Sequence, residues 1–168
     1  MSDTDAVQKI VEQWSCQRPD LDVRPMEVLG RLTRTSQLVD KELNKVFARY
    51  KLHAREFDIL ATLRRSGEPF ALSPSQIVES LMVNNSTMTN RLDRLEEAGR
   101  IKRVPIKGDR RGVHVELTKE GLKLIDHVVE EHLENEKAIL GPLSEKEQAS
   151  LAKLLSKLEK KMHKPSSE

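Results

Sequence analysis

Residues 73–99 constrain the fold most, because they predict two helices joined by a very short turn. Ser73 and Gln76 stand at capping-box spacing and open a short helix over 74–82. A second helix over 84–99 follows almost at once, and the glycine at its end can adopt the left-handed conformation. Two helices separated by so tight a turn predict a helix-turn-helix.

The second of these helices has two different faces. Apolar residues recur at helical spacing on one face, which we expect to be buried; they are Met88, Leu92, Leu95 and Ala98. The other face carries hydroxyls, an amide and a guanidinium, which are the groups that read base edges and phosphates from a recognition helix. The alternative is that this polar face is an ordinary solvated surface that contacts no DNA. The residues predicted to contact DNA from the two helices are Ser75, Gln76, Ser86, Thr87, Thr89, Asn90 and Arg94.

After this helix the hydrophobic pattern changes to a period of two. Residues 101–106 and 113–117 alternate in this way and predict a β-hairpin. The tip between them is short and rich in turn residues, so it can enter or straddle a minor groove. The alternative is that the tip is only a solvated loop. Its position directly after a helix-turn-helix favours binding in the minor groove. The basic residues of this tip are Lys107, Arg110 and Arg111.

Helical patterns also flank this region on both sides. They cover residues 6–17, 25–50, 53–66, 118–138 and 144–162. A second capping box, Ser144 with Glu147, opens the last of them. The helix over 118–138 carries one apolar stripe, formed by Leu122, Ile125, Val129 and His132. The chain is therefore predicted to be mainly α with a small β-wing.

Composition and charge agree with an assembly of long helices. Hydrophobic residues make up only 37% of the 168 residues, charged residues 33% and aromatic residues 3%. This balance suggests that some apolar surface is buried between subunits. Residues 100–112 hold six basic side chains against one acid, whereas residues 116–147 hold nine acids against four lysines. Such asymmetry suggests that one surface meets a polyanion and another does not.

Several classes of function find no support in the sequence. There is no glycine-rich phosphate loop, HExxH or CxxC motif, and no nucleophile with a neighbouring base, so we expect no enzyme activity and no cofactor. His127 with Glu130 or Glu131 offers two metal ligands but no third. A single cysteine, no secretory leader and no apolar run of membrane-spanning length predict a protein of a reducing cytoplasm.

At this point the order of parts resembles the MarR family of bacterial transcription regulators. The similarity covers nearly the whole chain and rests on "SPSQIVESLMVNNSTMTNRLDRLEEAGRIKR", the wing "GDRRGVHVELTKEG" and the flanking helices. The wing pattern, Asp109-x-Arg111 followed by Leu117-Thr118, is specific to that family. More narrowly, "QRPDLDV", "YKLHAREFDILATLRRSG" and "VVEEHLENE" resemble its PecS branch, which is close to the urate-responsive regulators.

The resemblance implies a winged helix-turn-helix with flanking dimerisation helices. Residues 1–50 would form N-terminal helices for dimerisation and a pocket wall, 51–118 the DNA-binding domain, and 119–168 the C-terminal dimerisation helices. A homodimer would place two recognition helices in the major groove of a palindromic operator and its wings in the minor groove. Such a repressor is cytoplasmic, associates with the nucleoid when bound, and is released by a small anionic ligand such as urate.

The resemblance also implies a ligand site. By motif match the residues are Trp14, Asp58, Ser66 and Arg91, with Ser66 standing where the urate-responsive relatives have an asparagine. The set is chemically coherent, because a guanidinium attracts an anion, an indole offers a stacking wall, and a carboxylate is repelled by the incoming charge. Individually, Asp58 could be a surface carboxylate and Trp14 a docking anchor.

Three alternatives remain open. Cys16 could make the regulator a thiol-based redox sensor, although no basic side chain is close in sequence before Arg18. The chain could instead be an architectural DNA-binding protein without a ligand. Finally, His132 continues an apolar stripe and is a candidate pH sensor, or else a silent hydrogen-bonded histidine.

Overall fold

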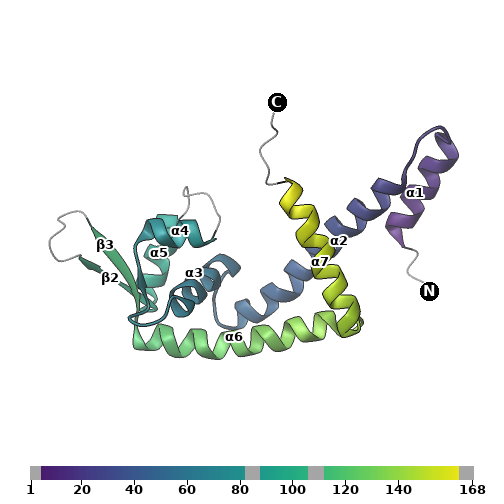
Figure 1. Ribbon diagram of the computed structural model, residues 1–168. Helices are drawn as coiled ribbons and strands as arrows, with labels where there is room; N and C mark the ends of the chain where they lie inside the picture. The colour runs from purple at the N-terminus through teal and green to yellow at the C-terminus, as the bar shows by residue number, and fades with distance from the viewer. Residues whose placement is uncertain (1–4, 82–87, 106–111, 163–168) are drawn as a thin grey trace. The chain divides into compact units, whose positions relative to one another are not determined.

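The computed structural model describes residues 5–81, 88–105 and 112–162. The chain divides into two compact units, Met1–Lys45 and Val46–Glu168, and Figure 1 shows the elements of each. Helices dominate, with one small antiparallel sheet, so the predicted fold class is confirmed. No helix within the described part of the chain is long and apolar enough to cross a membrane.

The first unit consists of helix α1 (Ala6–Gln17) and most of helix α2 (Arg24–Arg49). Asp5 caps α1 by accepting hydrogen bonds from the backbone amides of its first turn. The same carboxylate forms an ion pair with Arg31 of α2. Val7 is buried, and a Cβ at Gly30 would lie only 3.1 Å from its side chain. The two helices therefore pack closely at this point.

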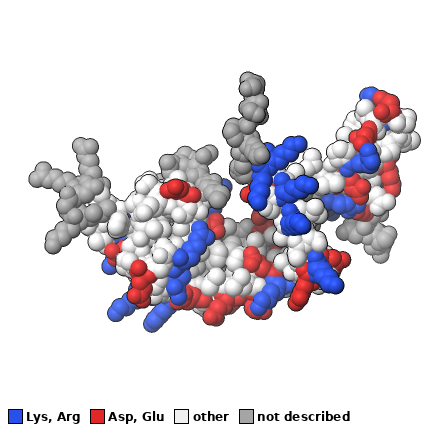
Figure 2. Space-filling view, viewed as in Figure 1, with Lys and Arg blue, Asp and Glu red and all other residues white. Residues whose placement is uncertain are grey.

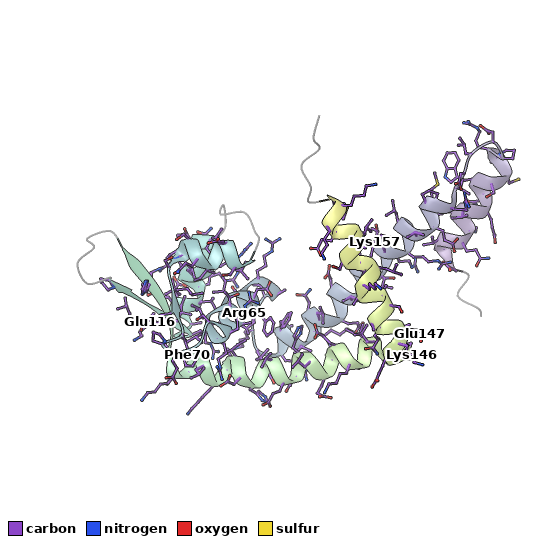
Figure 3. The ribbon with its side chains drawn as sticks, viewed as in Figure 1. Arg65, Phe70, Glu116, Lys146, Glu147 and Lys157 are labelled. Carbon is purple, nitrogen blue, oxygen red and sulfur yellow. The ribbon has the colours of Figure 1, made fainter. Side chains whose placement is uncertain are left out.

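The second unit contains a three-helix cluster, a sheet and two further helices. The cluster is formed by α3 (Ala54–Arg65), α4 (Pro74–Leu81) and α5 (Met88–Glu97). The last two helices are α6 (Lys119–Leu140) and α7 (Glu145–Met162). The predicted capping box of α7 is confirmed, because the Ser144 amide donates to Glu147 Oε2 at 2.8 Å and the Glu147 amide donates back to Ser144 Oγ. Figure 3 labels Glu147 at this first turn.

The sheet has the strand order β1-β3-β2 and is antiparallel throughout. The predicted hairpin is confirmed as β2 (Ile101–Pro105) and β3 (Val113–Leu117), with Ile101 opposite Leu117 and Pro105 opposite Val113. The short strand β1 (Ala71–Leu72) pairs with the other edge of β3. One further backbone hydrogen bond extends this pairing, because the amide of Leu117 donates to the Phe70 carbonyl at 3.2 Å. This strand was not predicted from the sequence.

The core of the second unit is built around α3, which packs against α4, α5, α6 and β3. The side chains of this core are fully or almost fully buried and include Ile59, Leu60, Leu63, Ile77, Leu92, Leu95, Val115, Ile125 and Val128. Two expectations need correction. Ala98 is exposed because α5 ends at Glu97, one residue earlier. On α6 the buried valine is Val128, whereas Val129 is only partly covered.

Candidate nucleic-acid interface and ligand site

Helix α5 presents the two faces that its sequence predicts. Met88, Leu92 and Leu95 are buried on the side that packs against α3 and β2. Thr89 and Asn90 are exposed. The helix ends in a turn where Gly99 has a φ of +69°, the left-handed conformation expected there. Helix α5 thus presents a hydroxyl and an amide on its solvent-exposed face.

Arg94 is also on this surface, but it is already paired. Its side chain is 57% exposed, and its Nε lies 3.3 Å from Oε1 of the buried Glu56 in α3. The predicted contacts Ser86 and Thr87 lie outside the described residues.

Ser75 and Gln76 of α4 are exposed and belong to the start of that helix. The predicted capping box is confirmed, since the Ser73 amide donates to Gln76 Oε1 at 2.9 Å and the Gln76 amide donates to Ser73 Oγ at 3.3 Å. The Ser75 hydroxyl lies 2.9 Å from that of Ser73. Both predicted DNA contacts on α4 therefore also hold the first turn of the helix together.

The hairpin is fixed to α5 by Arg103 of β2. Its guanidinium pairs with Asp93 at 2.6 Å and with Glu96, and its backbone amide donates to Glu96 Oε1 at 3.0 Å. Desolvation alone would lower the pKa of Arg103, but its hydrogen bonds and charge contacts with the two acids outweigh this and raise it. The residues predicted at the tip, Lys107, Arg110 and Arg111, lie outside the described part of the chain.

Helix α6 is joined to the turn between α5 and β2 by Thr118 and Gly121. The Thr118 hydroxyl donates to the Gly99 carbonyl at 2.7 Å and accepts the Gly121 amide at 3.0 Å. A Cβ on Gly121 would stand 1.9 Å from the Arg100 carbonyl oxygen, so only glycine fits this approach. Helix α5, the β-hairpin and α6 are consequently tied together over a few residues.

The residues predicted to bind a ligand are divided between the two units. Trp14 is exposed in the first unit, whereas Asp58, Ser66 and Arg91 belong to the second. Ser66 ends α3, and its hydroxyl donates to the Leu63 carbonyl at 2.7 Å. Asp58 is solvent-accessible, and partial burial raises the pKa of its carboxyl group.

Four basic side chains oppose this pKa rise of Asp58. They are His132, Arg65, Arg55 and Arg91. Arg65 is labelled in Figure 3, near the end of α3. The family resemblance pairs Arg91 with Asp58 but does not include Arg55 or Arg65. An anion entering this region would meet several guanidinium groups and one carboxylate.

His132 lies among the apolar neighbours that its sequence position predicts. The rings of Phe47 and Phe57 have centroids 5.3 and 4.8 Å from its own, and its side chain is 14% exposed. Its Nε2 lies 3.1 Å from Glu136, one turn further along α6. Its Nδ1 is buried and has no hydrogen-bond partner among the described residues.

The sequence also raised Cys16 as a redox sensor and His127 as a metal ligand, and the structure describes both residues. Cys16 is a free, exposed thiol on α1. His127 lies 2.9 Å from the Tyr50 hydroxyl and 3.4 Å from Glu131. Across residues 5–81, 88–105 and 112–162, no group of three or more potential ligands is arranged to hold a metal ion.

Two residues that support the candidate nucleic-acid interface, Glu56 and Arg103, were not singled out from the sequence. Glu56 stands three residues after His53, which is capping-box spacing, but histidine is not among the preferred N-cap residues. Arg103 follows a pair of acids one turn apart on the preceding helix, Asp93 and Glu96. Acids at that spacing beside a basic strand could have suggested the clamp.

A helix-turn-helix followed by a clamped β-hairpin defines a winged-helix protein. Comparison with protein-family profiles matches residues 52–113 to the MarR family. The HTH-type transcriptional regulator PecS of Dickeya dadantii (strain 3937) is 62% identical to this chain over 154 residues, which cover 92% of this chain and 93% of that protein. The chain therefore belongs to the MarR family of transcriptional regulators.

Two solved structures extend the comparison. A mutant of Escherichia coli MarR in complex with operator DNA has a TM-score of 0.68 and 28% identity, and the match covers 81% of this chain and 96% of that one. BpsR of Bordetella bronchiseptica, studied for the regulation of its DNA binding by 6-hydroxynicotinic acid, has a TM-score of 0.69 and 26% identity. That match covers 79% of this chain and 92% of BpsR.

Proposed function

We propose that the protein is a homodimeric repressor that binds a palindromic operator and is released by a small planar anion. One observation carries the DNA-binding part. Helix α5 buries its apolar face against α3 and β2 and leaves Thr89 and Asn90 exposed, while Arg103 fixes the hairpin to the same helix. The resemblance to MarR, which has been solved with operator DNA, supports the same function.

The exposed apolar side chains support a dimer. On α1 and α2 they include Ile10, Met26, Val28, Leu29 and Leu32, and on α7 they include Leu151, Leu154, Leu155, Leu158 and Met162. Exposed apolar side chains in such number are typical of a surface that meets another protein, and a second copy of the same chain could cover them. Helix α7 is described over its whole length and buries no residue in the single chain, so it has the most to gain from a partner.

The test begins with duplexes selected by the protein from a pool of random sequences. We expect palindromes whose half-sites are about one helical turn, roughly 34 Å, apart, bound by two chains. The control is the same duplex with one half-site scrambled, which should bind much more weakly. Asn90→Ala should weaken binding to the palindrome and relax base preference. Full-affinity binding by a monomer would contradict the proposal.

We infer that the anion binds near Asp58 and Arg91. Arg91 is on the recognition helix, so a ligand that moves it would tilt the DNA-reading face; this is the differential contact that allosteric release requires. The raised pKa of Asp58 reflects a carboxylate in partly desolvated surroundings, with Arg91 among the charges acting on it. The regulation of BpsR by a planar aromatic acid supports a ligand of that class.

Urate and 6-hydroxynicotinate are the probes for this site. Each should reduce operator binding by the wild-type protein, and Arg91→Ala should remove the response while leaving basal binding largely intact. Arg64→Ala is the matched control, because it removes one positive charge from α3 at a residue that pairs with Asp126 at 2.6 Å rather than with Asp58. If Arg91→Ala abolished operator binding and neither anion affected the wild type, Arg91 would be a DNA contact.

Two rival functions receive less support. Arg18, the basic residue nearest Cys16 in sequence, is engaged by Asp20 at 2.6 Å, so its charge is not free to activate the thiol. For the architectural alternative a broad basic surface would be expected. Figure 2 shows acidic side chains interspersed with basic ones along α6.

A further inference from the structure

Glu56 is a buried carboxylate with two distinct contacts. Its side chain is 4% exposed, although it belongs to a helix whose other charged residues reach solvent. Oε2 accepts the backbone amide of His53 at 2.9 Å and so caps the start of α3. Oε1 has no hydrogen-bond partner within the described part of the chain, and its neighbour is Arg94 of α5, whose Nε lies 3.3 Å away. Capping α3 therefore explains only one of the two oxygens.

A buried carboxylate needs a compensating charge, and Arg94 supplies it. The pairing uses the Nε edge of the guanidinium, while the side chain as a whole stays 57% exposed. Arginine presents its donors as a rigid planar fork, so an ion pair at one edge restricts the directions that the other edge can take. The terminal amino groups of a guanidinium held in this way are the groups that bind the O6 and N7 atoms of guanine in a bidentate manner.

We infer that Glu56 is a positioning residue for DNA recognition, which holds Arg94 ready to read a guanine. This inference rests on the proposed function and adds a specificity-determining pair to it. A flexible arginine loses rotamer freedom when it binds a base, whereas one already held by α3 loses less. Glu56 thereby improves recognition without touching the DNA.

The first experiment replaces Glu56 with glutamine, which keeps an oxygen for the His53 amide and removes the charge that holds Arg94. The probes are the selected palindrome and a scrambled duplex of the same composition. We expect Glu56→Gln to weaken palindrome binding about tenfold, which lies within the discrimination that one bidentate arginine–guanine contact provides, and to leave binding of the scrambled duplex unchanged. In an Arg94→Ala background the same substitution should cause no further loss.

The matched control is Glu97→Gln, which removes one negative charge from an exposed residue of α5 itself. Less negative charge near DNA should leave affinity unchanged or slightly higher, opposite in sign to Glu56→Gln. The inference is overturned if Glu56→Gln binds the palindrome as tightly as wild type, weakens both duplexes equally, or has its full effect without Arg94. Failure of the wild type to prefer the palindrome would overturn the proposed function as well.

A second variant, Arg94→Lys, tests the inference if Glu56→Gln does not fold. Arg94→Lys changes an exposed side chain and keeps its charge. A single ammonium group cannot contact Glu56 and bind the O6 and N7 atoms of a guanine at the same time. The preference for the palindrome over the scrambled duplex should fall about tenfold while the salt dependence stays the same. Unchanged preference in Arg94→Lys would overturn the inference.

Discussion

The backbone amide of Arg103 donates to Oε1 of Glu96 at 3.0 Å, so the first strand of the wing is bound to the recognition helix through main chain as well as side chain. Two acids one turn apart on α5 accept from one guanidinium, since Asp93 also pairs with it at 2.6 Å. This arrangement is more specific in geometry than a single surface ion pair.

Arg103→Ala should therefore lower both stability and operator affinity. We expect a loss of about 1–3 kcal/mol in the free energy of unfolding, because charge-assisted hydrogen bonds are broken and two acids lose their partner. Urea unfolding measures this. The control is Lys102→Ala on the same strand, which breaks only the cross-strand pair with Glu116 and should cost less than about 1 kcal/mol. Equal effects of the two substitutions would show that Arg103 is an ordinary surface residue.

Gly121→Ala should be among the most damaging single-methyl changes in the chain. The added Cβ would lie 1.9 Å from the Arg100 carbonyl oxygen, and backbone on both sides must shift to admit it. We expect a loss of at least about 2 kcal/mol in the free energy of unfolding. Gly141→Ala is the comparison, because its Cβ would approach the Ala138 carbonyl only to 3.2 Å; it should be several times milder in the same assay.

Local patterns in the sequence were sufficient to predict the hairpin, two capping boxes and the left-handed Gly99, because each depends on residues close together along the chain. The two-residue strand β1 is too short to show a period, and it forms only because β3 offers a free edge. On α6, a period of 3.6 residues fits Val128 and Val129 almost equally well, and packing against α3 decides between them.

The contacts of the candidate site depended more on tertiary structure. Arg94 was predicted to face DNA, but its pairing with Glu56 joins residues 38 positions apart, and no local pattern encodes it. In the same way, the apolar stripe of α6 indicated that His132 is covered, whereas Phe47 and Phe57 come from other helices. Sequence periodicity indicates which face is buried but not which residues cover it.

The wing residues Arg110 and Arg111 are expected to contact DNA. Substituting either with alanine should lower affinity and reduce the slope of log affinity against log salt by up to about one unit for each phosphate that the variant no longer neutralises. If one of them reads a narrow minor groove instead, its loss will depend on the A·T content of the site. Titrations at several salt concentrations separate the two cases. An unchanged slope in the double variant would remove the wing from the interface.

His132 provides a test of pH sensing. Protonation would place a charge beside Phe47 and Phe57, with the carboxylates of Glu136 and Asp58 available to attract it. We expect operator affinity of the wild type to change between about pH 8 and pH 5.5 and to stay flat in His132→Gln at constant salt. A change of the same size in both proteins would exclude His132 as the sensor.

Asp58 should oppose folding at neutral pH, so Asp58→Asn is expected to stabilise the protein. Burial raises the folded-state pKa of this carboxyl group above 3.8, which means that the folded protein holds the proton more tightly than the unfolded chain does. The resulting stability is fully present below pH 3.8 and is lost as the pH rises through the folded pKa. Asn cannot ionise, so the variant should gain over wild type as the pH rises from about 3 to 7 and then level off. Unfolding midpoints measured across that range test the sign: a variant less stable than wild type at about pH 7 would show that attraction to Arg91, Arg65, Arg55 and His132 exceeds the cost of desolvation.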